Sequence, residues 1–394
     1  MKRQLVFVAS VLCFTICAAQ NGKAQWVSTN GPTTKPVTCL YGGIITLAGC
    51  QDGIYSGSSN SWTSMNGTLT NPGVVTVTYD LNRSNVFIGT DRGKVYASFN
   101  GGDWMDISTN SGIVKIFSLA VNDTNVYVGT DGTFWHSGDL GTKWKSLSPP
   151  VSQGTVTSMV VSGQSLLAVC QNAVYISPDN GSTWTPANTG LPTHVLMLAL
   201  GIDPEIFAGT DNGVYATSNN GTTWLPINQG ITGKSVTSVT TDGTNIYAGT
   251  QTEGVFFSRN NGAAWQAANT DLPTMKINAM AVNFQQEVLA ATDANGVWKR
   301  SILDFIFNSV NDPKQSNLNI SLSPNPSSGL ITVHSAQDNI LNVSVRNILD
   351  ETVLDITKPN SPEFTLDLSR FPSGIYVAAF TSSTSVITKK IVRE

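Results

Sequence analysis

The chain has 394 residues, with 22 basic and 26 acidic side chains and a net charge of −4. Only 12% of its residues are charged, against about 25% in average soluble domains. This composition excludes the basic field of a nucleic-acid-binding protein, and the 40% hydrophobic content excludes disordered and collagen-like chains. Together with 35 glycines, it favours a turn-rich, all-β protein long enough for more than one domain.

The first segment, residues 1–19, has the pattern of a signal peptide. Lys2 and Arg3 precede an apolar run that ends in small residues at Ala19. That run is about 15 residues long, which is shorter than the roughly 20 residues that a membrane-spanning helix needs. We therefore expect cleavage near Ala19 or Ala24, export of the protein, and no transmembrane segment in the mature chain.

The cysteines lie on both sides of the expected cleavage site. Two of the five lie in the apolar run, where a lipoprotein anchor is an alternative, although each follows a bulky residue. Cys39, Cys50 and Cys170 remain, which is an odd number for an exported chain. Hairpin pairing around the intervening glycine turn would place Cys39 opposite Thr46 and not opposite Cys50. We expect three buried free thiols and no disulfide.

Residues 20–303 repeat with a period of about 40 residues, which sets the predicted architecture. Each unit holds four short runs of alternating apolar and polar residues, separated by turn signals such as Asp-Gly and Asn-Gly. Four antiparallel strands per repeat of this length are typical of a β-propeller blade, so the sequence predicts a seven-bladed β-propeller. The periodic tryptophans are Trp26, Trp62, Trp104, Trp144, Trp184, Trp224 and Trp265.

The last unit lacks its fourth strand in the sequence. After Trp298 the chain continues without a further turn and without the next periodic tryptophan. The missing piece has a counterpart near the other end, because Trp26–Gly31 matches Trp62–Gly67. We expect the N-terminal strand to complete the seventh blade, since this would close the ring and remove both free edges.

The turn before several tryptophans resembles the Asp-box, also called the BNR repeat. Two units match Ser-x-Asp-x-Gly-x-x-Trp fully, and two keep the spacing with Asn in place of Asp. The acidic or amide side chain suits bonds to backbone N–H groups, and Gly suits positive φ. The resemblance implies a structural clip and not an active site. Its residues are Ser137, Asp139, Gly141 and Trp144; Ser177, Asp179, Gly181 and Trp184; Asn219, Gly221 and Trp224; and Asn260, Gly262 and Trp265.

The remaining chain reads as a polar linker over residues 304–319 and a small β-sandwich over residues 320–394. Three stretches, Leu322–Ser327, Leu366–Tyr376 and Thr388–Val392, resemble the C-terminal sorting domain of the Bacteroidetes type IX secretion system. This resemblance implies export to the cell surface or beyond, with the type IX secretion machinery as a partner. An Ig-like adhesion module is the alternative. The residues that carry the resemblance are Pro324, Asn325, Pro326, Gly374, Tyr376, Lys389 and Lys390.

Polar residues at the turns between the second and third strands of the units are the candidates for a ligand-facing rim. They are expected to open on one face of the ring, although Asp before Gly also simply suits a tight turn. A glycosidase needs two facing carboxylates, roughly 5 to 9.5 Å apart. The rim candidates are Asp52, Asp91, Asp131, Asp211 and Asp293.

No catalytic residue, metal site or cofactor is predicted. The three histidines are isolated from one another, and sialidases, which share such repeats, need an arginine triad whose setting is absent. We expect a non-catalytic binding or scaffold module that takes an extracellular protein, peptide or glycan and no nucleic acid. The alternative is an extracellular glycoside hydrolase, since xyloglucanases also look like Asp-box propellers; an adhesin or matrix protein is a third class.

Overall fold

The computed structural model describes residues 25–307 and 320–394, apart from short gaps. The gaps are residues 33–34, 59, 71, 81–82, 110, 202–203, 294–295, 336–339, 348–351, 358–362 and 382–385. The expected signal peptide and residues 308–319 of the expected linker lie outside the described residues. The described chain is nearly all β, with α1 (Ile302–Phe307) as a short helix.

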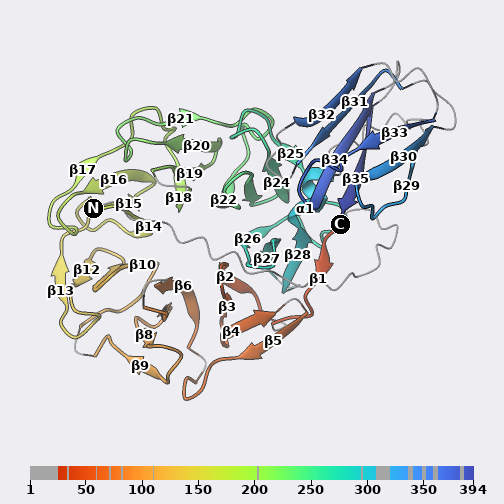
Figure 1. The fold of residues 1–394 in the computed structure, drawn as a ribbon. Helices are drawn as coiled ribbons and strands as arrows, with labels where there is room; N and C mark the ends of the chain where they lie inside the picture. The colour runs from red at the N-terminus through yellow and green to blue at the C-terminus, as the bar shows by residue number, and fades with distance from the viewer. Residues whose placement is uncertain are drawn as a thin grey trace.

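Seven four-stranded antiparallel sheets follow one another around a ring in the described part of the chain (Figure 1). The first three sheets are β2 (Val37–Tyr41), β3 (Thr46–Cys50), β4 (Gly53–Ser58) and β5 (Ser61–Ser64); β6 (Val74–Asp80), β7 (Asn85–Thr90), β8 (Val95–Ser98) and β9 (Trp104–Asp106); and β10 (Ser118–Asn122), β11 (Asn125–Gly129), β12 (Phe134–Ser137) and β13 (Lys145–Leu147). The next three are β14 (Val156–Ser162), β15 (Ser165–Cys170), β16 (Ala173–Ser177) and β17 (Thr185–Pro186); β18 (Val195–Leu200), β19 (Ile206–Thr210), β20 (Gly213–Thr217) and β21 (Leu225–Pro226); and β22 (Val236–Thr241), β23 (Ile246–Thr250), β24 (Val255–Ser258) and β25 (Gln266–Ala267).

The seventh sheet joins the two ends of the ring. It contains β26 (Ile277–Val282), β27 (Glu287–Thr292), β28 (Val297–Ser301) and, from the start of the described chain, β1 (Val27–Ser28). β1 is antiparallel to β28, with Val27 opposite Lys299 and Ser28 opposite Trp298. Trp26, 1% exposed, packs edge-on against Phe305 of α1. The helix thus begins before residue 304 and packs on this sheet, where the sequence suggested the start of a polar linker.

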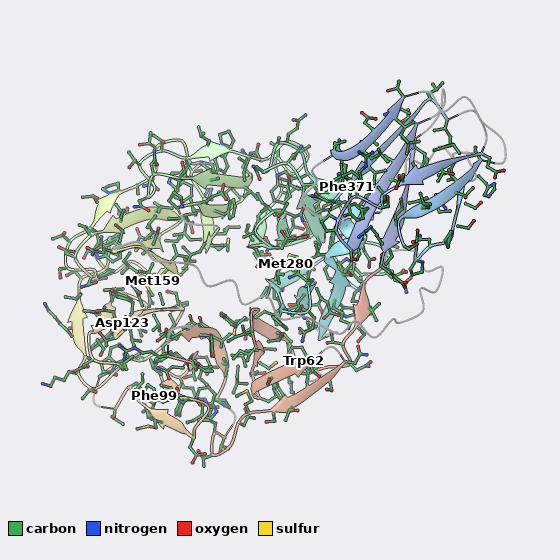
Figure 2. All side chains as sticks on the ribbon, viewed as in Figure 1. Trp62, Phe99, Asp123, Met159, Met280 and Phe371 are labelled. Carbon is green, nitrogen blue, oxygen red and sulfur yellow. The ribbon has the colours of Figure 1, made fainter. Side chains whose placement is uncertain are left out.

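Apolar side chains of neighbouring sheets pack together in shared clusters; Figure 2 draws the side chains on the ribbon. The second strand of each sheet carries most of this burial; β3, β19 and β23 are buried at every residue. Met280 of β26 packs in a cluster with Tyr247 and Phe257 of the preceding sheet. Because apolar residues on both faces of these strands contact neighbouring sheets, each sheet depends on its neighbours for its core.

A β-bulge near the start of the first strand recurs in six of the seven sheets. In the first sheet the bulge lies at Thr38, and it sets Cys39 opposite Gly49, so the expected pairing of Cys39 with Thr46 is wrong. The bulged side chains also tie neighbouring sheets together, since Thr38 Oγ1 donates to Val74 O at 2.5 Å. Asn278 Nδ2 does the same across the closure, to Val37 O at 3.1 Å.

The C-terminal module consists of two facing sheets. The three-stranded sheet has the order β29 (Ile320–Ser323), β30 (Leu330–Ser335) and β33 (Glu363–Asp367). The four-stranded sheet has the order β32 (Thr352–Thr357), β31 (Asn342–Arg346), β34 (Gly374–Thr381) and β35 (Val386–Arg393). They enclose one apolar cluster that includes Ile331, Val343, Leu366 and Phe380. The module therefore has a core of its own.

Candidate functional site

The periodic tryptophans link each sheet to the preceding one. Six of the seven donate an indole hydrogen bond to a group three residues after the preceding tryptophan, at 2.5 to 2.9 Å. The exception is Trp184, whose buried Nε1 has no partner among the described residues. The bonds join Trp26 to Ala268 O, Trp62 to Thr29 Oγ1, Trp104 to Met65 O, Trp144 to Ile107 O, Trp224 to Ala187 O, and Trp265 to Ile227 O. The series crosses the joined ends, because Trp26 and Thr29 belong to it.

The turns that resemble Asp-boxes form compact hydrogen-bonded clips between the third and fourth strands. Ser177 Oγ accepts a bond from Gly181 N at 2.7 Å and donates to Asp179 Oδ1 at 2.9 Å. Asp179 Oδ1 also accepts from Thr183 N at 2.8 Å, and this backbone bond lowers the pKa of the carboxyl group. Gly181 has φ 83°, and a Cβ there would lie 2.2 Å from Phe134 of the preceding sheet. These side chains bond to their own turn.

The same bonds recur in the other three turns, whether the residue is Asp or Asn. The Gly N–H donates to the Ser or Thr hydroxyl at 2.8 to 3.1 Å. The Asp or Asn Oδ1 accepts from a backbone N–H four residues later at 2.8 to 3.0 Å. Asn therefore replaces Asp without loss of the turn. The residues are Ser137, Asp139 and Gly141; Thr217, Asn219 and Gly221; and Ser258, Asn260 and Gly262.

The five rim carboxylates lie at corresponding turns but in different surroundings. Asp131 Oδ1 accepts a bond from Thr155 Oγ1 at 2.6 Å. Asp211 Oδ2 lies 3.0 Å from His194 Nδ1. Asp293 Oδ2 lies 2.7 Å from Lys276 Nζ, and that bond lowers the pKa of the carboxyl group. Each of these three is thus held by a neighbouring residue.

Asp52 and Asp91 are the two rim residues that share a pocket. The pocket lies between the first two sheets, at the β3–β4 and β7–β8 turns, and has a volume of about 280 Å³. Two acidic and two basic side chains line it, together with an amide and a glycine: Lys35, Gln51, Asp52, Gly73, Asp91 and Arg92. Periodicity in the sequence predicted that these turns open on one face, but it did not indicate which pair shares a cavity.

Asparagines four residues after a periodic tryptophan hold the rim turns, and the sequence analysis missed them. Asn66 Oδ1 accepts from Ile54 N at 2.8 Å, while its Nδ2 donates to Asp52 O at 3.0 Å. Asn269 makes the equivalent bonds to Val255 N and Glu253 O. Asn188 and Asn228 each make one bond of this kind. The signal was visible as a repeated Trp-x-x-x-Asn spacing.

The three stretches that resemble a sorting signal meet at β35. Asn325, between the exposed Pro324 and Pro326, donates from Nδ2 to Lys390 O at 2.7 Å and accepts from Val392 N at 2.8 Å. β34 pairs with the same strand, with Gly374 opposite Arg393 and Tyr376 opposite Ile391. Tyr376 also donates to Pro372 O at 2.6 Å, and Lys389 and Lys390 are exposed. Segments about 65 residues apart in sequence therefore form one surface.

The described residues contain free thiols but no metal-binding cluster and no helix that could cross a membrane. No group of three or more His, Cys, Asp or Glu side chains is arranged to hold a metal ion there. In the same residues, no helix has the length and apolar character required to cross a membrane. Cys39, Cys50 and Cys170 are free thiols; Cys50 and Cys170 are buried as expected, whereas Cys39 is only partly buried. Burial raises the pKa of Cys39 and Cys50 to about 12.

Comparison with known proteins identifies the C-terminal part by sequence. Residues 313–394 match the model of the secretion system C-terminal sorting domain. No curated protein matches the chain.

Solved structures identify the fold of the rest. The chain is similar to PorZ, an essential bacterial surface component of the type-IX secretion system of Porphyromonas gingivalis, with 13% identity and a TM-score of 0.56 over 89% of this chain and 56% of PorZ. It is also similar to the extracellular domain of a putative hybrid two component system from B. thetaiotaomicron, with 12% identity and a TM-score of 0.62 over 95% and 58% of the two chains. YCF48 bound to D1 peptide matches with 11% identity and a TM-score of 0.56 over 72% and 97%.

This chain spans little more than half the length of the first two proteins, and identities this low show the fold alone. The chain is a β-propeller protein whose residues 313–394 match the secretion system C-terminal sorting domain.

Proposed function

We propose that this protein is exported by the type IX secretion system and acts as a non-catalytic binding or scaffold module at the cell surface or beyond it. Its partner would be an extracellular protein, peptide or glycan, and the secretion machinery would engage the C-terminal domain. In this proposal residues 1–19 are a signal peptide, residues 20–303 form a seven-bladed propeller with Asp-box turns, and residues 320–394 are the sorting domain.

The bonding of the polar rim residues supports the non-catalytic part of the proposal. Asp131, Asp211 and Asp293 are each held by a neighbouring side chain, and the Asn66 and Asn269 side chains bond to the turns themselves. Carboxylates and amides that bond to their neighbours in this way shape a rim, whereas a glycosidase needs two carboxyl groups that face each other across the bond to be cleaved. Regular rims of this kind suit recognition of a partner.

The test uses the purified chain from Gln25 to Glu394 on glycan and peptide arrays, alongside hydrolysis assays on the glycans that bind. We expect binding without release of product. Turnover of a bound polysaccharide would contradict the proposal, and so would the absence of any binding on either array.

A glycoside hydrolase is the second candidate, because Asp52 and Asp91 line one pocket. If this pair were catalytic, Asp91→Asn would abolish hydrolysis while retaining glycan binding. We expect instead no hydrolysis by the unmodified chain on any polysaccharide that it binds.

A further inference from the structure

The pocket between the first two sheets has a balanced set of charges. Lys35 and Arg92 supply two positive charges, and Asp52 and Asp91 supply two negative ones. A ligand with a net charge would leave one of these side chains without compensation, whereas a neutral ligand with both charges would match the set. Its volume of about 280 Å³ lies just below the roughly 300 to 1,000 Å³ typical of drug-sized ligands, so a smaller molecule fits it.

Two of these side chains are available to a ligand. Lys35 and Asp52 already interact with other groups. The Asp91 carboxylate and the Arg92 guanidinium, both on exposed residues, make no hydrogen bond or ion pair with any residue that the structure describes. Because they are consecutive, their Cα atoms are about 3.8 Å apart, so a side chain that can be anionic and one that is cationic reach this pocket from the same turn.

The backbone holds Asp91 at the edge of this pocket. Asp91 N donates to Gly73 O at 2.9 Å, and Gly73 N donates to Gln51 O at 3.0 Å, which joins the pocket-forming turns. Gly73 has φ 59°, and a Cβ at this position would lie 2.3 Å from Asp91 Oδ1. The absence of a side chain at residue 73 therefore leaves the space that the carboxylate occupies.

We infer that this pocket binds a free α-amino acid as its zwitterion, with the ammonium group on Asp91 and the carboxylate on Arg92. Arg binds carboxylates through two N–H donors, and a carboxylate accepts charge-assisted bonds from an ammonium group. In an α-amino acid the ammonium group and the carboxylate group are attached to the same carbon, which suits two consecutive side chains better than the longer separation in a dipeptide. No aromatic side chain is among the lining residues described, and so the pocket lacks the stacking surface expected for a sugar.

This inference goes beyond the proposed function, because it adds a small-molecule ligand to the protein, peptide or glycan partner proposed above. It is tested by calorimetric titration of the purified chain with the common L-amino acids at millimolar concentration. For the amino acid that binds most tightly, the N-acetyl form removes the ammonium group and the amide form removes the carboxylate. We expect each blocked form to bind about tenfold more weakly or worse, the usual effect of losing a charge-assisted bond.

The variants assign each charge to one side chain. Asp91→Asn should weaken the free amino acid to the level of its N-acetyl form, and Arg92→Gln should weaken it to the level of its amide. Glu253→Gln is the matched control, because Glu253 occupies the corresponding β23–β24 turn outside this pocket and pairs with Lys234. It should leave affinity unchanged. Thermal melts of each variant check that it is folded.

Three results would overturn the inference: no amino acid binds, blocked and free forms bind equally, or binding persists in both Asp91→Asn and Arg92→Gln. Tighter binding of a dipeptide or a methyl glycoside through Asp91 would also overturn it. Array binding by the unmodified chain without binding of any amino acid would support the proposed function and refute only the inference about this pocket. Conversely, amino acid binding that depends on Asp91 and Arg92, without binding on either array, would contradict the proposed function alone.

Discussion

Replacement of Trp26 by Ala tests whether the N-terminal segment holds the ring together. Trp26 is 1% exposed, donates to Ala268 O at 2.5 Å, and packs on Phe305. Truncation of a buried Trp to Ala costs about 3 to 5 kcal/mol. The Ala268 carbonyl keeps a bond from Arg300 Nη1 at 3.3 Å, so no further penalty for an unpaired acceptor is added.

We expect Trp26→Ala to lower the free energy of unfolding by about 3 to 5 kcal/mol in urea denaturation of the chain from Gln25 to Glu394, followed by far-UV circular dichroism. Val27→Ala is the control, since Val27 is the next residue along the chain but is 47% exposed, and such changes stay within about 0.5 kcal/mol. If Trp26→Ala costs no more than this control, the N-terminal segment does not close the ring in the way that the structure indicates.

Three further outcomes follow from the repeated contacts. Trp224→Phe should cost about 1 kcal/mol more than Trp184→Phe in the same denaturation assay, because Trp224 Nε1 bonds to Ala187 O at 2.8 Å while Trp184 Nε1 has no partner among the described residues; equal costs would contradict this difference. Backbone bonds lower the pKa of Asp139 and Asp179 in the folded state, so they contribute stability above the ordinary Asp pKa of 3.8 that is lost as pH falls through the folded value. An Asp139→Asn, Asp179→Asn variant should therefore show a smaller loss of stability below pH 4 than the unmodified chain, as measured by thermal melts across pH; identical pH profiles would refute it. Cys39, Cys50 and Cys170 should resist a thiol reagent in the native chain and all react after denaturation without reductant, whereas a mass shift of only one label would reveal a disulfide.

The regular spacing of the tryptophans predicted most of the fold. Aromatic residues at fixed spacing indicate repeated sheets because each must pack against a neighbour, and the match of Trp26–Gly31 with Trp62–Gly67 indicated where the chain ends meet. The bulge at Thr38 could not be predicted from the sequence, because Thr is common in regular strands. Its side chain bonds to Val74 O of the next sheet, and this contact is not visible in the local sequence. The helix at Ile302–Phe307 was also hidden, since Phe305 is buried by Trp26, Tyr247 and Phe257, which all lie far from it in the sequence.

The candidate site was less accessible to sequence reasoning. The five rim aspartates occupy equivalent positions in the repeat, so periodicity treats them as alike. Their surroundings differ through side chains outside the repeat pattern: Asp211 lies beside His194 and Asp293 beside Lys276, while Asp91 shares a pocket with Lys35. Which turns form a pocket depends on contacts between two sheets, and the local sequence of either turn does not contain that information.

Export by the C-terminal domain is the central claim, and one localisation experiment tests it most directly. The full chain and a chain that stops after Phe307 are expressed in a type IX host, and each is located by fractionation and by protease treatment of intact cells. We predict that the full chain reaches the surface or the medium, while the shortened chain stays folded in the periplasm. Arrival of the shortened chain outside the cell at the same level would contradict the account.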